Sequence, residues 1–307
     1  MERPTALVVQ IEHGGIVLTS HGPAVDCAIW VDPEASTRRG SGAFGLPRTT
    51  AAPVVVGSWI GSVSSGASVN CPAVSLVAHS AGTHTECVGH ATLRTVTLRD
   101  ILPAHLLFPA VLVTVEPTRL NARDDDLYVG SQPGDAVVTR SLLSTALERC
   151  AQDVGIGHDK WKALLRGGAV AVRTRKWQDT NMAAYDWSGT NPPYLTPSAV
   201  ALLCDAGVEH LLVDLPSLDR EYDGGKLQTH RRWWGLPPKR PDGHDATDPW
   251  STRTATEMLA VPDACGDGLY ILNLNVAPIA LDAAPSRPLL YPAATLRQPR
   301  VTFALAQ

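Results

Sequence analysis

The sequence predicts an α/β fold, and the main reason is a helix that leads directly into a strand. Thr196 can cap a helix that has Pro197 at its first position and ends at Gly207. The apolar run 208–214 follows at once and has the length of a buried strand. Further apolar runs of strand length are 106–115, 169–174 and 268–276. Helices alternating with such runs are typical of α/β proteins.

The N-terminal part of the chain is expected to consist of short strands and loops. A glycine turn separates 6–11 from 15–18, so these segments are expected to pair as a hairpin, and 26–31 is expected to be another strand. Residues 38–53 are rich in Gly, Pro, Ser, Thr and Arg and are expected to form a long loop. The stretch 53–63 again has the composition of a strand.

Farther along, 73–78 is expected to be a buried strand, and 139–150 and 226–234 are expected to be helices. The loop 121–135 holds Asp124, Asp125 and Asp126 but lacks the glycine and the terminal glutamate of a calcium loop, so it is expected to be solvated surface. No internal repeat or clean linker divides the chain. Residues 1–307 are therefore expected to form a single domain.

Composition excludes several classes of partner. The net charge is −4 and the pI is about 6.2, which gives no electrostatic basis for binding nucleic acid or a membrane surface. No apolar run is long enough to span a bilayer. The six cysteines form no C-x-x-C pair, and the N-terminus lacks the features of a signal peptide, so we expect reduced thiols and a cytoplasmic protein.

One stretch of twelve residues, 79–90, concentrates the groups that bind metals. It holds His79, His84, Glu86 and His90 and contains no Lys or Arg. His84 and Glu86 are two positions apart, so on an extended segment both side chains leave the same face. His90 can curl back over that face if the chain turns at 88–89. Imidazole and carboxylate are ligands that Zn²⁺ and Mn²⁺ accept, whereas a histidine-rich surface loop is the alternative without chemistry.

A metal held in this way can lower the pKa of a bound water and so supply hydroxide near neutral pH. A spare imidazole beside the metal could carry the proton from the attacking water to the leaving group. The motif therefore predicts hydrolysis of an amide, an ester or a lactone-like bond.

The same stretch resembles the motif H-x-G-T-H-x-D-x-P-x-H of the cyclase family of metal-dependent hydrolases, which includes kynurenine formamidases and isatin hydrolases. Gly82-Thr83-His84 matches G-T-H, Glu86 stands at the Asp position, and His90 matches the final His. A second block, from Thr196-Pro197 through 212–219 to His230, is similar to the family's I-D-T-P-S-x-D region. Together the two blocks cover about a third of the chain.

The resemblance implies a swivelling β/β/α fold, with a central mixed sheet or barrel flanked by helices, and a homodimer whose site lies near the subunit contact. It implies that His84, Glu86 and His230 bind the metal and that His90 is the catalytic acid/base. His79 would be a further ligand. The substrate would be a small amide, ring amide or lactone, and kynurenine formamidase of tryptophan catabolism is the best-known analogue.

The chain departs from the family pattern at four places. His79 precedes His84 by five residues instead of four, Glu86 replaces Asp, and Val88 replaces Pro. The family's late Glu ligand, expected on the final strand, aligns with Leu272, which cannot bind a metal. Either the site then holds one metal, or Asp219 or Glu221 replaces the missing carboxylate. The alternative function is a non-catalytic metal-binding or ligand-binding protein on the same fold, which the loss of the late Glu favours.

Overall fold

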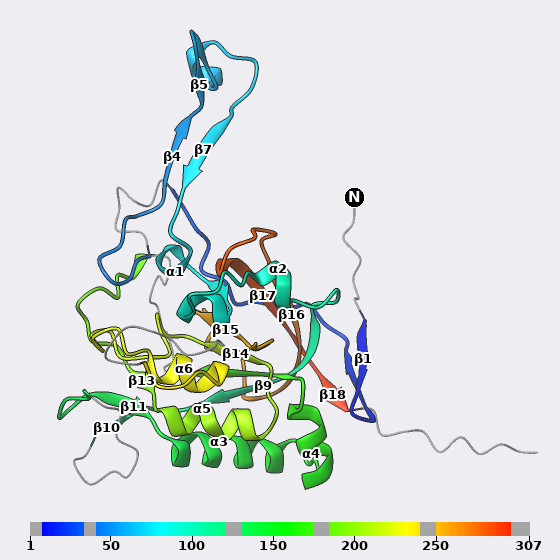
Figure 1. The fold of residues 1–307 in the computed structure, drawn as a ribbon. Coiled ribbons are helices and arrows are strands. Elements are labelled where there is room, and N and C mark those ends of the chain that lie inside the picture. The colour runs from blue at the N-terminus through cyan, green and yellow to red at the C-terminus, as the bar shows by residue number, and fades with distance from the viewer. Residues whose placement is uncertain (1–7, 34–40, 121–129, 175–183, 240–249, 296–307) are drawn as a thin grey trace, which may run out of the picture.

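The computed structural model describes residues 1–307 except 1–7, 34–40, 121–129, 175–183, 240–249 and 296–307 (Figure 1). The predictions for Asp124, Asp125 and Asp126, for the first residues of the 6–11 strand and for the start of the 38–53 loop therefore lie outside the described residues.

The body of the protein is a closed, barrel-like mixed sheet with helices beside it, as the predicted fold class requires. Seven strands form the ring in the order β16-β9-β12-β14-β15-β8-β17, and β17 pairs back to β16. They are β8 (His84–Glu86), β9 (Leu107–Thr114), β12 (Ala169–Arg173), β14 (His210–Val213), β15 (Thr254–Glu257), β16 (Gly268–Val276) and β17 (Ala283–Pro292). Strands β9, β12, β14 and β15 run parallel to one another, and β8, β17 and β16 close the ring through antiparallel pairings.

Smaller strands extend this barrel. β1 (Val9–His13) and β2 (Ile16–Ser20) form the expected N-terminal hairpin, which β18 (Ala294–Thr295) joins. β3 (Val25–Asp26) pairs with β17, so only the start of the expected 26–31 segment is strand. β10 (Thr118–Arg119), β11 (Ala136–Val138) and β13 (Tyr194–Leu195) form a separate three-stranded sheet.

Four helices lie together at one side of the barrel (Figure 1). They are α3 (Arg140–Asp153), α4 (His158–Leu165), α5 (Pro197–Asp205) and α6 (Gln228–Trp234), and the shorter α1 (Ala78–Ala81) and α2 (Leu98–Ile101) lie near β17. The predicted helices 139–150 and 197–207 are confirmed, and the hydroxyls of Thr139 and Thr196 cap them. α4 was not expected from the sequence.

The strands of the barrel are buried on both faces. On β9, Val111 and Val113 pack in the main core with α3, α4 and α5, whereas Ala110 and Leu112 belong to a second apolar cluster on the other face. This two-sided burial explains why 106–115, 169–174 and 208–214 read as continuous apolar runs without alternation. None of the described helices combines the length and the apolar character needed to cross a bilayer.

A β-arm, residues 50–75, projects from the body (Figure 1). It contains β4 (Thr50–Pro53) paired with β7 (Pro72–Ser75), and β5 (Val55–Val56) paired with β6 (Trp59–Ile60) at its tip. The prediction that 73–78 is a buried strand was therefore wrong. β7 is exposed along its length, and the chain then turns into α1 at Ala78. An apolar composition alone cannot distinguish a core strand from the strand of an exposed arm.

Gly89 provides a test of how tightly the segment 87–90 is folded. A Cβ atom at this position would lie 1.9 Å from the carbonyl oxygen of Val96, so the backbone would have to shift. We expect Gly89→Ala to lower the free energy of unfolding by about 1–3 kcal/mol, because overpacking forces such shifts. Gly266→Ala is the control, since its Cβ would meet nothing within 4 Å. Urea unfolding that gives equal stabilities for the two variants would contradict this packing.

Candidate metal centre

Strand β8 places His84 and Glu86 at the centre of the site. As expected for an extended segment, the two residues lie on a strand, and β15 and β17 pair with it on both sides. Neither side chain has any exposed surface. The ring of His84 is oriented by its Nδ1 atom, which lies 3.0 Å from the carbonyl oxygen of Gly82, so Nε2 is left to face the site.

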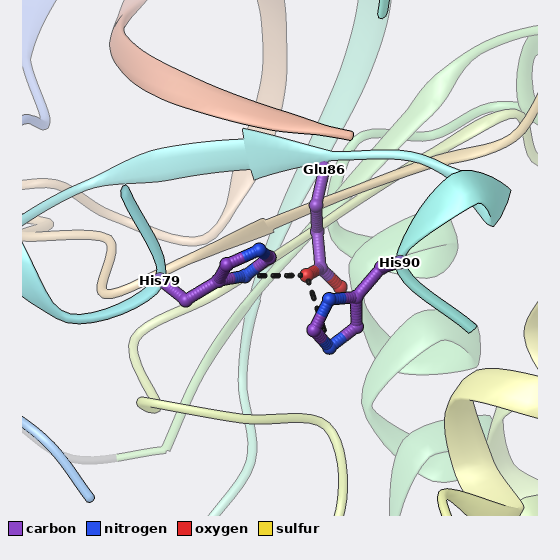
Figure 2. A group of neighbouring side chains, drawn as sticks. All are labelled: His79, Glu86 and His90. Atoms are coloured by element: carbon purple, nitrogen blue, oxygen red, sulfur yellow. Dashed lines mark ion pairs between the residues drawn. The ribbon is translucent and has the colours of Figure 1, made fainter. Parts of the chain in front are cut away.

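The segments on either side of β8 fold back toward Glu86. The single turn of α1 takes up the extra residue between His79 and His84, and Nδ1 of His79 lies 3.1 Å from Oε2 of Glu86. The 3-10 turn 88–91 returns His90, whose Nε2 lies 3.9 Å from the same oxygen. Figure 2 shows the two rings on either side of the Glu86 carboxylate. The expected turn at 88–89 is confirmed.

Gly82 permits a close approach between two segments of backbone. A Cβ atom there would lie 2.7 Å from the carbonyl oxygen of Ile29, so this strand connection has no room for a side chain. Thr83, the next residue, accepts a hydrogen bond from the backbone N–H of Ile29 and donates one to the carbonyl of Met258. These contacts lock the start of β8 to the segments beside it.

Helix α6 brings His230 to the same point from far along the chain. Its Nε2 lies 2.8 Å from Oε1 of Glu86 and 3.1 Å from Oε1 of Glu257. Asp219 holds the helix start, because its carboxylate accepts the backbone N–H groups of Thr229 and His230. The same carboxylate lies 2.5 Å from Nδ1 of His230 and so fixes the orientation of the ring.

Glu257, at the end of β15, is a further buried carboxylate beside these histidines that sequence reasoning missed. Its oxygens lie 3.1 Å from Nε2 of His230 and 3.4 Å from Nε2 of His84. Leu272, where the resemblance placed the late Glu, packs in an apolar cluster away from these side chains. Asp219 contacts His230 from behind, and Glu221 accepts the backbone N–H groups of Gly189 and Asn191 in a separate loop. Among the described residues, neither belongs to the groups whose ligand atoms lie within 4.8 Å of one another.

Asp282 is a second residue that sequence reasoning missed. It stands just before β17, and its Oδ2 atom lies 3.0 Å from Nε2 of His79 and 3.3 Å from Nδ1 of His90. About two hundred residues separate Asp282 from each histidine in the sequence. A single aspartate in a loop also belongs to no sequence motif, so the contact could not be predicted.

The donor set fits a divalent cation. His84, Glu86 and Glu257 offer one ligand atom each, all within 4.8 Å of one another, and His79, Glu86 and His90 form a second such group. Nε2 of His84 and both oxygens of Glu86 are buried, and within the described residues none of these three atoms has a hydrogen-bond partner of acceptable geometry. Buried polar atoms are normally satisfied, so these atoms are poised for an ion. Nitrogen and carboxylate oxygen suit Zn²⁺ and Mn²⁺ alike.

The charges of the cluster are strongly coupled. Burial by itself would lower the pKa of His79, but the adjacent carboxylates of Asp282 and Glu86 raise it to about 10. Burial likewise opposes charge on His230, yet Glu86, Asp219 and Glu257 together raise its pKa well above the usual value. The buried carboxylates of this cluster are therefore stabilised by positive charge, which either protonated imidazole rings or a bound metal ion can supply. Metal binding must then release protons.

The loop that carries Asp219 is anchored by Asp135. This buried carboxylate accepts hydrogen bonds from Nε of Arg220 at 2.8 Å, from the amide of Asn191 at 2.9 Å and from the hydroxyl of Tyr194 at 3.1 Å. Because Arg220 is the residue next to Asp219, this network fixes the position of Asp219. Asp219 in turn contacts His230 and fixes its position.

Three other buried rings and the cavity nearest to β8 do not belong to the donor set. Trp233 and Trp234 are buried in the main core, although the Trp234 ring lies 5.2 Å from that of His230. His210 is buried at the far end of β14, where burial and nearby His105 lower its pKa to about 4. A cavity of about 410 Å³ lies against Thr83, Trp30 and Arg287, and no residue of the cluster lines it.

Comparisons with known proteins agree with the geometry. The family model described as "Putative cyclase" matches residues 20–220. A "predicted metal-dependent hydrolase" from Bacillus stearothermophilus is similar in structure, with a TM-score of 0.51 and 15% identity over 87% of this chain and 97% of that one. Isatin hydrolase A from Labrenzia aggregata has a TM-score of 0.51 and 14% sequence identity, over 89% of this chain and 94% of that one. Isatin hydrolase A from Ralstonia solanacearum has a TM-score of 0.51 and 15% sequence identity, over 88% of this chain and 91% of that one. No curated protein matches in sequence.

We expect Asp135→Asn to destabilise the fold by roughly 1–3 kcal/mol at pH 7, because Arg220 loses its charged partner. Burial would raise the pKa of Asp135, but the hydrogen bonds from Arg220, Gln132, Asn191 and Tyr194 lower it from 3.8 to about 2. The native pKa lies below the unfolded one, so this stabilisation is complete above about pH 4 and is lost as the pH falls toward 2. Urea unfolding from pH 7 to pH 2 checks this, and a stability difference that does not shrink in acid would contradict it.

Proposed function

The chain belongs to the cyclase family, and we propose that it is a metal-dependent hydrolase of a small amide, ring amide or lactone. The observation that carries the proposal is the buried set of His84, Glu86 and Glu257, whose ligand atoms lie within 4.8 Å of one another. Nε2 of His84 and both oxygens of Glu86 have no hydrogen-bond partner of acceptable geometry among the described residues. The isatin hydrolases among the structural neighbours support the reaction class.

In this proposal the metal is held by His84, Glu86, His230 and Glu257, with His79 as a further ligand. When bound, it supplies a Lewis acid and a water of lowered pKa. Glu86 belongs to both candidate ligand groups, so it is the residue that two cations would share. The ligand set fits Zn²⁺ and Mn²⁺, and we propose one of these.

His90 is the proposed acid/base. Its ring is about a quarter exposed, whereas His84, Glu86 and His230 are almost fully buried, so it stands where the cluster opens to substrate. Nε2 faces Glu86 while Nδ1 faces Asp282, which leaves one nitrogen to take a proton from the attacking water and return it to the leaving nitrogen or oxygen. His84, with no exposed surface, cannot perform this transfer.

Kynurenine-formamide-like and isatin-like compounds are the substrates to test first, since a formyl amide and a strained ring amide both present a carbonyl to attack. The alternative of a non-catalytic protein rested on the loss of the late Glu. Glu257 removes that support, because the carboxylate is present on another strand. We also propose a cytoplasmic location, which the six free cysteines favour.

We further propose that the protein is a homodimer and that the β-arm forms its interface. Between Thr50 and Ser75 only Gly61 is buried. The exposed apolar side chains of the arm include Val55, Val56 and Trp59. An isolated two-stranded ribbon is at best marginally stable in water, so an arm of this kind needs a covering surface.

The character of the arm favours a second copy of this chain as the covering surface. No charged side chain or histidine occurs from Thr49 to Ala78, which excludes recognition of nucleic acid or anionic lipid by charge. The arm offers about the number of residues that each side of a standard interface uses. At the base of the arm, Pro33 lines a hollow together with Ala52 and Pro72.

His84→Ala is expected to abolish metal binding and hydrolysis together, because the variant loses a buried ligand. The measurements are metal content after incubation with Zn²⁺ or Mn²⁺ and a screen of N-formyl anilides, isatins and lactones. His158→Ala, an exposed position at the start of α4, is the control and should behave as the unaltered protein. A His84→Ala protein that retained metal and full activity would refute the assignment.

For the dimer, we expect the unaltered protein to sediment as a dimer and the double variant Val56→Ser, Trp59→Ser to sediment as a folded monomer. Leu93→Ser is the matched control, since Leu93 is 74% exposed but lies outside the arm, and it should remain dimeric. Analytical ultracentrifugation with circular dichroism separates dissociation from unfolding. A monomeric unaltered protein, or an arm variant that stays dimeric, would overturn the proposal.

A further inference from the structure

Asp282 contacts two histidines of the site through a single oxygen. Oδ2 lies 3.0 Å from Nε2 of His79 and 3.3 Å from Nδ1 of His90, and the two rings lie 4.2 Å apart. The contact therefore engages the ε nitrogen of one ring and the δ nitrogen of the other. In both rings the remaining nitrogen faces Oε2 of Glu86, which Figure 2 shows between them.

The position of Asp282 is set by its backbone. Its carbonyl oxygen accepts the N–H of Cys87 at 2.9 Å, directly beside Glu86, and the carbonyl of Leu281 accepts the N–H of Leu98 at 2.9 Å. Gly89 lies against it, since a Cβ built on Gly89 would lie 3.4 Å from the Cβ of Asp282. The loop before β17 is thus fastened to the segment that carries the histidines, and the carboxylate is presented at a defined point.

Hydrogen bonding at one ring nitrogen decides which nitrogen of a neutral imidazole keeps its lone pair. A carboxylate only accepts, so in each ring the nitrogen that faces Asp282 carries hydrogen. On His90 the other nitrogen lies 3.9 Å from Glu86 and keeps the lone pair. His79 has a carboxylate at both nitrogens, so its Nδ1 keeps a lone pair only when a cation stands beside Glu86 in place of that hydrogen. Those are the two atoms that face Glu86. In the proposed function, Nδ1 of His79 is the metal ligand and Nε2 of His90 is the base.

We propose that Asp282 is a positioning residue that fixes opposite ring tautomers in His79 and His90 and thereby makes one a metal ligand and the other a general base. The inference rests on the proposed function for its catalytic part. Its structural part, the pair of tautomers, stands independently of any substrate. Outer carboxylates of this kind typically contribute 10–100-fold to metal affinity or activity.

The test compares Asp282→Ala, Asp282→Asn and Asp100→Asn. Asn keeps an acceptor oxygen for the two rings but loses the charge, whereas Ala removes both. Asp100 is the matched control, because its carboxylate caps α2, whose Leu98 binds the loop of Asp282, yet it touches neither imidazole. Long-range ¹H–¹⁵N correlation spectra of histidine-labelled protein, recorded with and without Zn²⁺, report which nitrogen of each ring carries hydrogen.

We expect His90 to carry hydrogen on Nδ1 with or without Zn²⁺, and His79 to carry it on Nε2 in the Zn²⁺-loaded protein. Asp282→Ala should lose this preference, lower Zn²⁺ affinity by about 10–100-fold in a chelator competition, and lower kcat by a similar factor with little change in KM. Asp282→Asn should keep the tautomers and recover part of the affinity. Asp100→Asn should change only the thermal stability.

Three outcomes would overturn the proposal. His90 could carry hydrogen on Nε2 in the unaltered protein, Asp282→Ala could leave the spectra and the Zn²⁺ affinity unchanged, or Asp100→Asn could reproduce every effect of Asp282→Ala. If no substrate is hydrolysed but the tautomers and the Zn²⁺ affinity respond as described, the proposed function fails while the role of Asp282 stands.

Discussion

The buried carboxylate of Glu86 is the constraint around which this structure is arranged. Removing a carboxylate from water costs several kcal/mol unless positive charge or hydrogen bonds replace the lost solvation. Within the described residues no hydrogen bond of acceptable geometry reaches either oxygen, and the groups closest to it are imidazole nitrogens. Glu257, a second buried carboxylate, increases this demand for positive charge. The protein therefore has a point in its interior where a divalent cation is strongly favoured over an empty space.

Elements distant in the sequence are held at this point by a small number of specific contacts. The barrel register places Glu257 opposite His84, because β15 and β8 are paired antiparallel. Asp219 orients His230 and caps the start of α6, and Asp282 contacts His79 and His90. Each metal-facing imidazole thus has a partner on its other side, either a carboxylate or, for His84, the carbonyl of Gly82. Such outer contacts hold ligands in place before a metal arrives.

Much of the fold and part of the site could be predicted from local patterns. The capped helix at Thr196, the apolar barrel strands and the alternation of His84 and Glu86 are all short-range features, and the structure agrees with each of them. Glu257 could not be found in this way, because β15 is only four residues long and Thr254–Glu257 carries no apolar run. Asp282 stands in a loop and acquires its role only through the pairing of β17 with β8. The arm was misread because its apolar residues resemble those of a core strand.

The measurement that tests the central claim most directly is a crystal structure of the Zn²⁺- or Mn²⁺-loaded protein with anomalous scattering recorded on both sides of the metal absorption edge. The account predicts an anomalous peak within coordination distance of Nε2 of His84, Glu86 and Glu257. Full loading without a peak at this position, and with the imidazoles hydrogen-bonded directly to the carboxylates instead, would contradict it.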